Sequence, residues 1–202
     1  MNYLAHAYLS FNHPKILTGN IISDYVKGKS KFTFEPFIQH GIMLHRAIDT
    51  FTDDHRCTKK AKQFLKPHYG LYAGAFIDVV YDHFLATDEN EFPGETLASF
   101  SQFTYHLLDE FENIFPEKFK VLYPYMKSHD WLYNYKFRWA IDKSFHNLVN
   151  RSTYLTEGDT AFQIFEEHYE QFRESYKEFF PEVKQFARHI FDDYLDRGQT
   201  DF

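Results

Sequence analysis

Several common signals of localisation are absent from this chain of 202 residues. Cys57 is the only cysteine, which excludes an intramolecular disulfide or a cysteine-rich zinc site and favours a reducing compartment. No apolar run approaches the roughly 18 residues that a membrane span needs, and residues 1–10 lack the positive region of a signal peptide. We therefore expect a cytoplasmic protein that has no membrane partner.

Familiar catalytic motifs are absent too. The chain has no Glu-x-x-His, which argues against a ferritin-like di-iron bundle, and it has no Gly-x-Ser-x-Gly elbow, Walker loop or dinucleotide fingerprint. The dipeptide His129-Asp130 stands in a weakly patterned stretch. For it, an exposed turn or a helix cap is favoured over a catalytic role.

Strand signals are scarce, because β-branched residues are scattered and spacings of three and four recur. The hydrophobic share of 44%, with 24 Phe and 15 Tyr, is enough for a substantial core. With no internal repeat and no Ser/Gly linker, residues 1–202 predict one all-α domain, a helical bundle. We expect metal-site residues within 1–85, and packing and substrate-side helices within 86–202.

The pattern of prolines, glycines and apolar spacings gives helix positions. Asp159 is a good N-cap for a long helix whose aromatic positions from Phe162 to Phe179 step by three or four, and Pro181 starts a last helix that ends near Tyr194. Helices are also predicted over 14–25, 36–49, 54–66, 69–86, 96–111 and 137–149.

The predicted helix over 69–86 is apolar nearly all round, yet Asp78 and Asp82 stand one turn apart on one face of it. An ionised carboxylate in a dry interior costs several kcal/mol unless something pairs with it. The two acids therefore imply a cation, which either a metal ion or a basic side chain can supply.

A second pair, His45 and Asp49, is also separated by four residues and shares a helix face. Taken alone, such a pair favours a structural hydrogen bond. Two pairs on two helices, together with Asp24 among apolar neighbours, favour a metal site of the kind that helical bundles build from inward side chains. The predicted ligands are Asp24, His45, Asp49, Asp78 and Asp82.

Carboxylates and imidazoles without thiolates suit Mn²⁺, Mg²⁺ or Fe²⁺, and Zn²⁺ also fits such a set. These ions promote phosphoester hydrolysis when a cationic group helps to hold the phosphate. Arg46 is a candidate for that group, with a surface ion pair as the alternative. His83 points about 100° away from Asp82 and would orient a neighbouring group or meet substrate. Asp53 is either a helix cap or a ligand.

The formal net charge of −7 argues against nonspecific binding to nucleic acid. The charge is uneven, however. Residues 27–66 hold nine Lys or Arg against four acids, a surplus of +5, so the rest of the chain carries −12. This basic segment, which includes Lys59, Lys60 and Lys62, is either a solvated helix face or a docking surface for an acidic partner.

Four ordered blocks within the first 85 residues resemble the acyl carrier protein phosphodiesterase family. They are residues 1–6 (MNYLAH), 19–24 (GNIISD), 41–49 (GIMLHRAID) followed by Thr52-Asp53, and 78–85 (DVVYDHFL), and residues 130–132 (DWL) extend the match. The resemblance implies a helical domain distantly related to the HD phosphohydrolases that uses Mn²⁺ or Mg²⁺. It also implies hydrolysis of the phosphodiester that joins 4′-phosphopantetheine to a serine of holo acyl carrier protein.

By position, the matching blocks imply a site formed by Asp24, His45, Asp49, Asp78, Asp82 and His83. His6 and Asn20 are expected to lie near this site. We assign catalytic roles to Asp24, His45, Asp82 and His83, phosphate binding to Arg46 and Asn20, and binding of the acidic carrier protein to Lys59, Lys60 and Lys62. The order Asp82-His83 reverses the His-Asp order of the HD motif. Two rival interpretations are an HD-like hydrolase of a nucleotide or small phosphoester, and a noncatalytic binding module whose acids are neutralised by Arg and His.

Overall fold

The computed structural model describes residues 1–152, 155 and 157–200, and the regular elements over these residues are all helical, as predicted. None of the described helices is long and apolar enough to cross a membrane. The α-helices are α1 (Tyr3–Tyr8), α2 (Pro14–Ile22), α3 (Pro36–Asp54), α4 (Arg56–Tyr69), α5 (Ala73–Ala86), α6 (Thr96–Asp109), α7 (Glu117–Ser128), α8 (Trp131–Asn134), α9 (Arg138–Arg151), α10 (Asp159–Glu167) and α11 (Tyr169–Thr200). Short 3₁₀ turns are η1 (Ser23–Tyr25), η2 (Gly28–Thr33), η3 (Gly70–Tyr72) and η4 (Glu112–Ile114).

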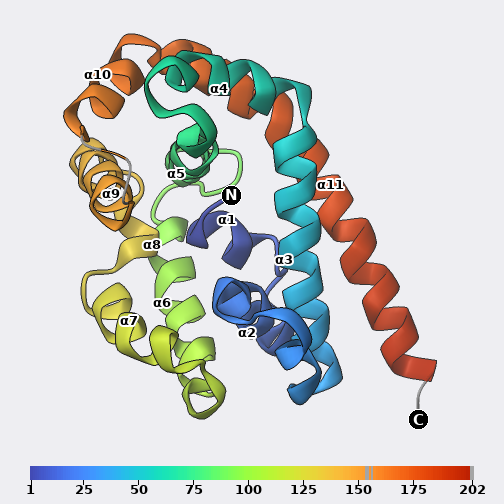
Figure 1. Ribbon diagram of the computed structural model, residues 1–202. Coiled ribbons are helices and arrows are strands. Elements are labelled where there is room, and N and C mark those ends of the chain that lie inside the picture. The colour runs from blue at the N-terminus through green and yellow to red at the C-terminus, as the bar shows by residue number, and fades with distance from the viewer. Residues whose placement is uncertain (153–154, 156, 201–202) are drawn as a thin grey trace.

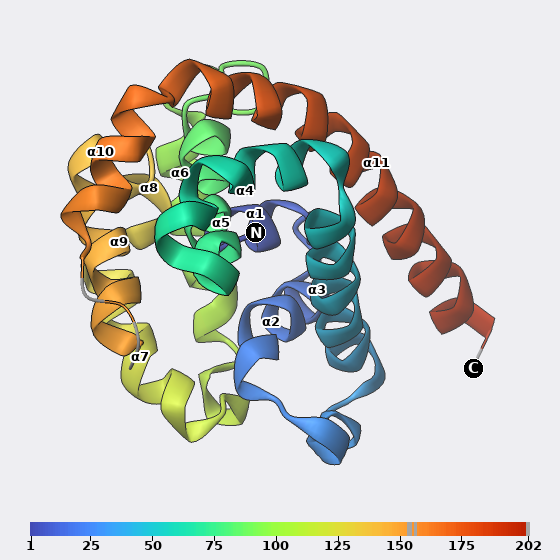
Figure 2. The same cartoon turned by 45° about the horizontal axis from the view of Figure 1, so that its top comes forward.

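The helices surround a centre formed by α1 and α5 (Figure 1). Helices α2 and α3 lie on one side of this centre and α6 to α9 on the other, while α11 passes over α4 and then along α3 (Figures 1 and 2). The first residue lies in the middle of the molecule and the C-terminal end of α11 lies at its edge (Figure 1). This arrangement brings the chain start against α5.

Helix α5 is the buried helix that the sequence predicts. Phe76, Ile77, Val79, Val80 and Leu85 are all fully buried. It begins at Ala73, four residues after the predicted start at residue 69, because Gly70 adopts a φ of 53° and opens the 3₁₀ turn η3. Asp82 and His83 on this helix are also buried, whereas Asp78 keeps part of its side chain exposed.

Helices α2 and α3 cross at two glycines, which explains how polar groups of the two helices come within hydrogen-bond distance. A Cβ atom on Gly19 would lie 2.0 Å from the carbonyl oxygen of Ile38, and one on Gly41 would lie 2.1 Å from that of Ile16. Only glycine permits such a close approach of two backbones. The crossing sets Asn20 against His45, one turn beyond Gly41.

The last part of the chain differs from the prediction. The N-cap of α10 is Gly158 rather than Asp159, and the helix ends at Glu167, before α11 begins at Tyr169. Helix α11 then continues through Pro181, where a new helix was predicted. Proline removes one backbone donor from a helix. Here the buried side chains of Phe180 and Val183 on either side of it hold the helix in one piece against the core.

Candidate active site

His45 on α3 is held with one ring nitrogen facing two carboxylates. Its Nδ1 donates to the carbonyl oxygen of Asn20 at 2.8 Å. Its Nε2 lies 3.2 Å from Asp24 Oδ1 and 3.1 Å from Asp49 Oδ2. Because a carbonyl oxygen can only accept, the proton on Nδ1 is fixed and Nε2 is presented to the acids. Histidines that bind metal ions are commonly oriented in this way.

His6 completes a compact group with His45 and Asp49. We call these three residues and Asp24 the His-Asp cluster. The rings of His6 and His45 stack with centroids 3.9 Å apart, and His6 Nε2 lies 3.2 Å from Asp49 Oδ1. One nitrogen or oxygen from each of His6, His45 and Asp49 lies within 4.8 Å of the others. Metal–ligand bonds of about 2.0–2.2 Å are compatible with such spacing.

Opposite charges shift the pKa values within the His-Asp cluster. Burial lowers the pKa of His45, but hydrogen bonds with Asp24 and Asp49 outweigh burial and raise it to about 9. Burial raises the pKa of Asp49, but hydrogen bonds with His45 and His6 hold it well below its usual range. The hydrogen bond with His45 also lowers the pKa of Asp24. Both carboxylates are therefore ionised at neutral pH.

His6 differs from its stacked neighbour, because burial and the positive charge of His45 lower its pKa to about 4. The ring is neutral at physiological pH. Sequence analysis noted His6 only as lying near the site, because its pairing with Asp49 joins residues 43 positions apart.

Asp78 pairs with the N-terminal ammonium group. The Met1 nitrogen lies 2.8 Å from Asp78 Oδ1 and 3.6 Å from Asp49 Oδ1. Burial opposes the charge of this ammonium, but Asp78 and Asp49 outweigh burial and raise its pKa to about 10. Burial raises the pKa of Asp78 despite the ammonium. The ammonium thus stands between Asp78 and the His-Asp cluster.

Asp82 accepts hydrogen bonds from the start of α1. Its carboxylate oxygens accept from the backbone N–H groups of Asn2 at 3.1 Å, Leu4 at 2.7 Å and Ala5 at 3.3 Å. The side chain is fully buried, and burial raises its pKa to about 7 although the ammonium and these N–H groups lower it. An acid at a helix N-terminus satisfies donors that have no partner within the helix. Asp82 therefore positions α1, and with it His6.

His83 makes its contacts on another side of α5. Nδ1 donates to the carbonyl oxygen of Tyr135 at 2.8 Å, and Nε2 lies 3.0 Å from the hydroxyl of Tyr169. Burial lowers the pKa of His83 to about 4, so the ring is neutral. The contacts join α5 to the end of α8 and the start of α11. The structure does not bring His83 into the His-Asp cluster.

The two predicted phosphate-binding residues are also placed by other contacts. Arg46 donates from Nη2 to the carbonyl oxygen of Val26 at 2.8 Å and lines a separate surface pocket beside Phe186. Asn20 is fully buried and donates from Nδ2 to the carbonyl oxygen of His6 and to Ser10 Oγ, both at 3.0 Å. Asn20 therefore holds both histidines of the cluster in position.

The donor set fits a divalent cation. Asp24 and Asp49 are ionised and lie within hydrogen-bond distance of one imidazole nitrogen, so two carboxylates are available to a cation. His6 Nδ1 and Asn20 Oδ1 are buried and have no hydrogen-bond partner in the described part of the chain. Imidazole and carboxylate donors without a thiolate are what Mn²⁺, Mg²⁺ and Fe²⁺ accept.

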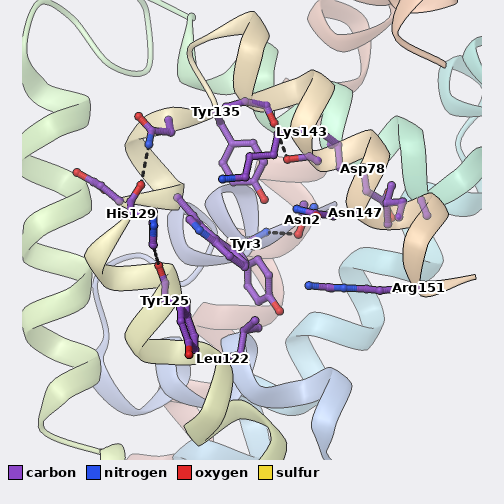
Figure 3. A pocket seen from close by; sticks show the side chains of 18 of the residues that line it. Asn2, Tyr3, Asp78, Leu122, Tyr125, His129, Tyr135, Lys143, Asn147 and Arg151 are labelled. Atoms are coloured by element: carbon purple, nitrogen blue, oxygen red, sulfur yellow. Dashed lines mark hydrogen bonds between the residues drawn. The ribbon is translucent and has the colours of Figure 1, made fainter. Parts of the chain in front are cut away.

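Figure 3 shows a pocket of about 890 Å³. Its lining includes Met1, Asp78 and Asp24, and Asp24 joins the pocket to the His-Asp cluster. The side chain of Asp24 is 69% exposed and that of Asp49 is 41% exposed, so both can meet a ligand. Aromatic side chains line much of the remaining surface, namely Tyr3, Tyr25, Tyr125, Trp131, Tyr135 and Trp139. A pocket of this size and composition suits a small organic ligand.

Helix α9 lines the same pocket with a row of residues that sequence analysis missed. Trp139, Lys143, Asn147 and Arg151 are each four positions apart and all face the pocket. The four-residue spacing of polar groups on an exposed helix was the signal that could have revealed them. Without the fold, such a row is the same as any solvated helix face.

The dipeptide His129-Asp130 forms a turn and a cap, which confirms the favoured interpretation. Asp130 has a φ of 43° and its side chain accepts from the backbone N–H of Tyr133, so it is the N-cap of α8. Asp130 also accepts hydrogen bonds from Ser101 and Gln102. Both residues of the dipeptide line the pocket.

The basic segment includes the exposed face of α4. Lys59 Nζ lies 3.2 Å from Asp54 Oδ1, Lys62 Nζ lies 2.6 Å from Asp53 Oδ1, and Lys60 is exposed. Asp53 is in the last turn of α3 and does not cap it. Two of the three lysines predicted to bind a partner are therefore already paired with acids of α3.

Comparisons with known proteins agree on one family. The family model described as acyl carrier protein phosphodiesterase matches residues 1–183. A protein of that name from Yersinia pestis is 30% identical over 190 residues, which cover 94% of this chain and 98% of the relative. Another from Pectobacterium atrosepticum is 29% identical over 189 residues, covering 93% of this chain and 98% of the relative. No solved structure matches the chain. The chain therefore belongs to the acyl carrier protein phosphodiesterase family.

Proposed function

We propose that this protein is a metal-dependent phosphodiesterase that removes 4′-phosphopantetheine from holo acyl carrier protein and releases the apo form. Family membership over most of the chain supports the reaction class. One observation supports the assignment of the metal centre to the His-Asp cluster. His45 Nε2 lies between the carboxylates of Asp24 and Asp49, and Asp24 also lines the large pocket. The cluster supplies charged donors and the pocket supplies space for an organic arm.

His6, His45 and Asp49 are the residues that would hold the metal ion, with Asp24 beside them. A divalent cation in this position lowers the pKa of a water molecule and offsets the negative charge of a phosphodiester. The donor set favours Mn²⁺ or Mg²⁺, and Fe²⁺ or Zn²⁺ also fits it. Asp78 and Asp82 would hold the neighbouring chain in place. Asp78 binds the N-terminal ammonium, and Asp82 accepts hydrogen bonds from the start of α1.

The protein groups have separate tasks in this proposal. The carbonyl oxygen of Asn20 keeps His45 Nε2 turned toward the acids, and the side chain of Asn20 holds the segment that carries His6. Asp24 is ionised, contacts His45 and lines the pocket. Its carboxylate is therefore the group placed to take a proton from the attacking water.

The acidic substrate protein needs a basic surface to approach an enzyme with a net charge of −7. The face of α4 with Lys59, Lys60 and Lys62 is our proposed docking surface. We also propose that the chain is a single HD-like domain that acts in the cytoplasm. One continuous apolar core from Met1 to Tyr194 supports the single domain.

The direct test is to mix the protein with holo acyl carrier protein and Mn²⁺ and to weigh the product. We expect a mass loss equal to the prosthetic arm, dependence on the divalent ion, and loss of turnover in His45→Gln. The matched control is His189→Gln, which removes an exposed histidine of α11 and should keep full activity. Turnover of nucleotides or small phosphoesters without turnover of the carrier protein would favour the HD-like hydrolase. Failure to bind a divalent ion would favour the binding module.

A further inference from the structure

We propose that Arg151 at the end of α9 is the phosphate-binding cation of this site, and that Lys143 and Asn147 hold the organic part of the same ligand. This inference rests on the proposed function, because it assigns further binding residues to that pocket. It replaces Arg46, whose guanidinium is bonded to the carbonyl oxygen of Val26 and lies at another pocket.

The first observation is the row of residues on α9. Lys143, Asn147 and Arg151 are exposed, share one helix face and line the pocket. In Figure 3 the side chain of Arg151 extends into the pocket toward Tyr3, while Lys143 lies beside Tyr135. The row therefore presents two positive charges and an amide to whatever occupies the pocket.

Lys143 and Arg151 form no ion pairs with acidic side chains in the described part of the chain. Elsewhere on the same side of the molecule, Arg138 pairs with Glu166 and Lys127 pairs with Asp109. A guanidinium that lines a pocket without a carboxylate partner is available to an anionic ligand.

Arg151 extends toward a pair of tyrosines that shares the pocket with Asp24 of the His-Asp cluster (Figure 3). The hydroxyls of Tyr3 and Tyr25 lie 2.9 Å apart on the pocket wall, next to Asp24. Burial and Tyr25 raise the pKa of Tyr3 well above its usual value, Asp24 raises it further, and Arg151 lowers it. The Tyr3 hydroxyl thus senses both Asp24 and Arg151. A group bound beside this hydroxyl pair would therefore meet the guanidinium in the pocket that Asp24 also lines.

Charge explains why such a cation is needed. A phosphodiester is an anion, and the acids Asp24 and Asp78 in the pocket lining repel it. A positive group in the same pocket offsets this repulsion, and a guanidinium can donate two parallel hydrogen bonds to phosphate oxygens. Eight residues separate Lys143 from Arg151, which is about 12 Å along a helix. The two cations therefore contact different parts of one ligand, and Arg151 is the one that extends toward Tyr3 (Figure 3).

The test compares Arg151→Gln and Arg151→Lys with the wild-type protein on two substrates, holo acyl carrier protein and bis(p-nitrophenyl) phosphate. Both substrates contain a phosphodiester, so we expect kcat/KM of Arg151→Gln to fall by about 10- to 100-fold on both. Arg151→Lys should lose less activity than Arg151→Gln, because lysine keeps the positive charge but cannot donate the two parallel hydrogen bonds of a guanidinium. Lys143→Met should lower kcat/KM on the carrier protein only.

A binding measurement separates this inference from the proposed function. Inorganic phosphate, followed by calorimetry, should bind Arg151→Gln at least about 10-fold more weakly than wild type, whatever the activity. The matched control is Arg173→Gln, an exposed arginine of α11 that pairs with Glu170 and should behave as wild type. Unchanged phosphate affinity in Arg151→Gln, or a loss that appears in Arg46→Gln instead, would overturn the inference. If His45→Gln keeps full activity, the proposed centre fails even where Arg151→Gln loses phosphate.

Discussion

Helices α3 and α5 each carry a histidine and acids among apolar residues, but the structure uses the two sets differently. On α3, His45 and Asp49 meet each other, His6 and the exposed Asp24. On α5, Asp82 accepts three backbone N–H groups and His83 bonds a carbonyl and a tyrosine hydroxyl. His45 and Asp49 on α3 therefore meet other titratable side chains, while Asp82 and His83 on α5 meet backbone groups and a tyrosine hydroxyl.

The difference follows from burial. Asp82 and His83 are fully buried, so each of their polar atoms needs a fixed protein partner. Asp49 and Asp24 keep access to solvent, so they can exchange a partner for a ligand. Chemistry is expected where charged groups remain accessible, and stability is expected where they are enclosed.

The largest effect that this comparison predicts is on activity. Asp49→Ala should lower kcat/KM for holo acyl carrier protein by about 10²- to 10³-fold, because it removes a donor from the His-Asp cluster. The free energy of unfolding should change by about 1 kcal/mol at most, since the side chain is partly exposed. Kinetics and urea titration measure both quantities. Asp54→Ala, an exposed acid of the same helix, is the control and should keep its activity.

Asp82→Ala should show the reverse pattern, with its main effect on stability. It leaves the N–H groups of Asn2, Leu4 and Ala5 without their acceptor, which should cost about 3 kcal/mol of unfolding free energy. Asp82→Asn keeps an oxygen acceptor and should lose less. Urea unfolding monitored by circular dichroism gives the values. A stable Asp82→Ala protein without turnover would contradict the stabilising role of Asp82 and indicate that α5 also carries a catalytic acid.

His83 should make the protein less stable in acid. In the unfolded chain this histidine binds a proton below about pH 6.5, whereas burial lowers its pKa in the folded protein to about 4. Its contribution to stability is therefore lost as the pH falls from about 6.5 toward 4, by up to about 1.4 kcal/mol per pH unit. His83→Gln should flatten that slope in urea titrations between these pH values. His189→Gln should leave it unchanged, and an equal slope in both variants would contradict the enclosed role.

The smallest predicted effect concerns the exposed lysines of α4, which lie outside both α3 and α5. Changing Lys59, Lys60 and Lys62 together to Glu should raise KM for holo acyl carrier protein several-fold, because the partner is acidic. The effect is limited because Lys59 and Lys62 already pair with Asp54 and Asp53. Hydrolysis of bis(p-nitrophenyl) phosphate should stay at the wild-type rate. An equal loss on both substrates would indicate misfolding rather than lost docking.

Much of the fold followed from local patterns. The buried helix with Asp78 and Asp82 and the α3 helix with His45 were predicted from apolar spacing, since burial on one or all faces repeats along a helix. Pro181 misled the prediction, because its effect on a helix depends on what the neighbouring side chains pack against. The partner of Asp82 could not be predicted either. Backbone N–H groups 77 to 80 residues away carry no sequence signal.

The sequence by itself determined that this protein is helical, that it belongs to a phosphodiesterase family, and that Asp24, His45 and Asp49 are candidates for one centre. Only the tertiary structure decided that His6 joins them, that Asp82 and His83 are satisfied elsewhere, and that α9 supplies cations to the pocket. Helix periodicity depends on neighbours within one turn, which the sequence contains. The partner of a buried charge depends on which helices meet, and that is fixed when the whole core packs.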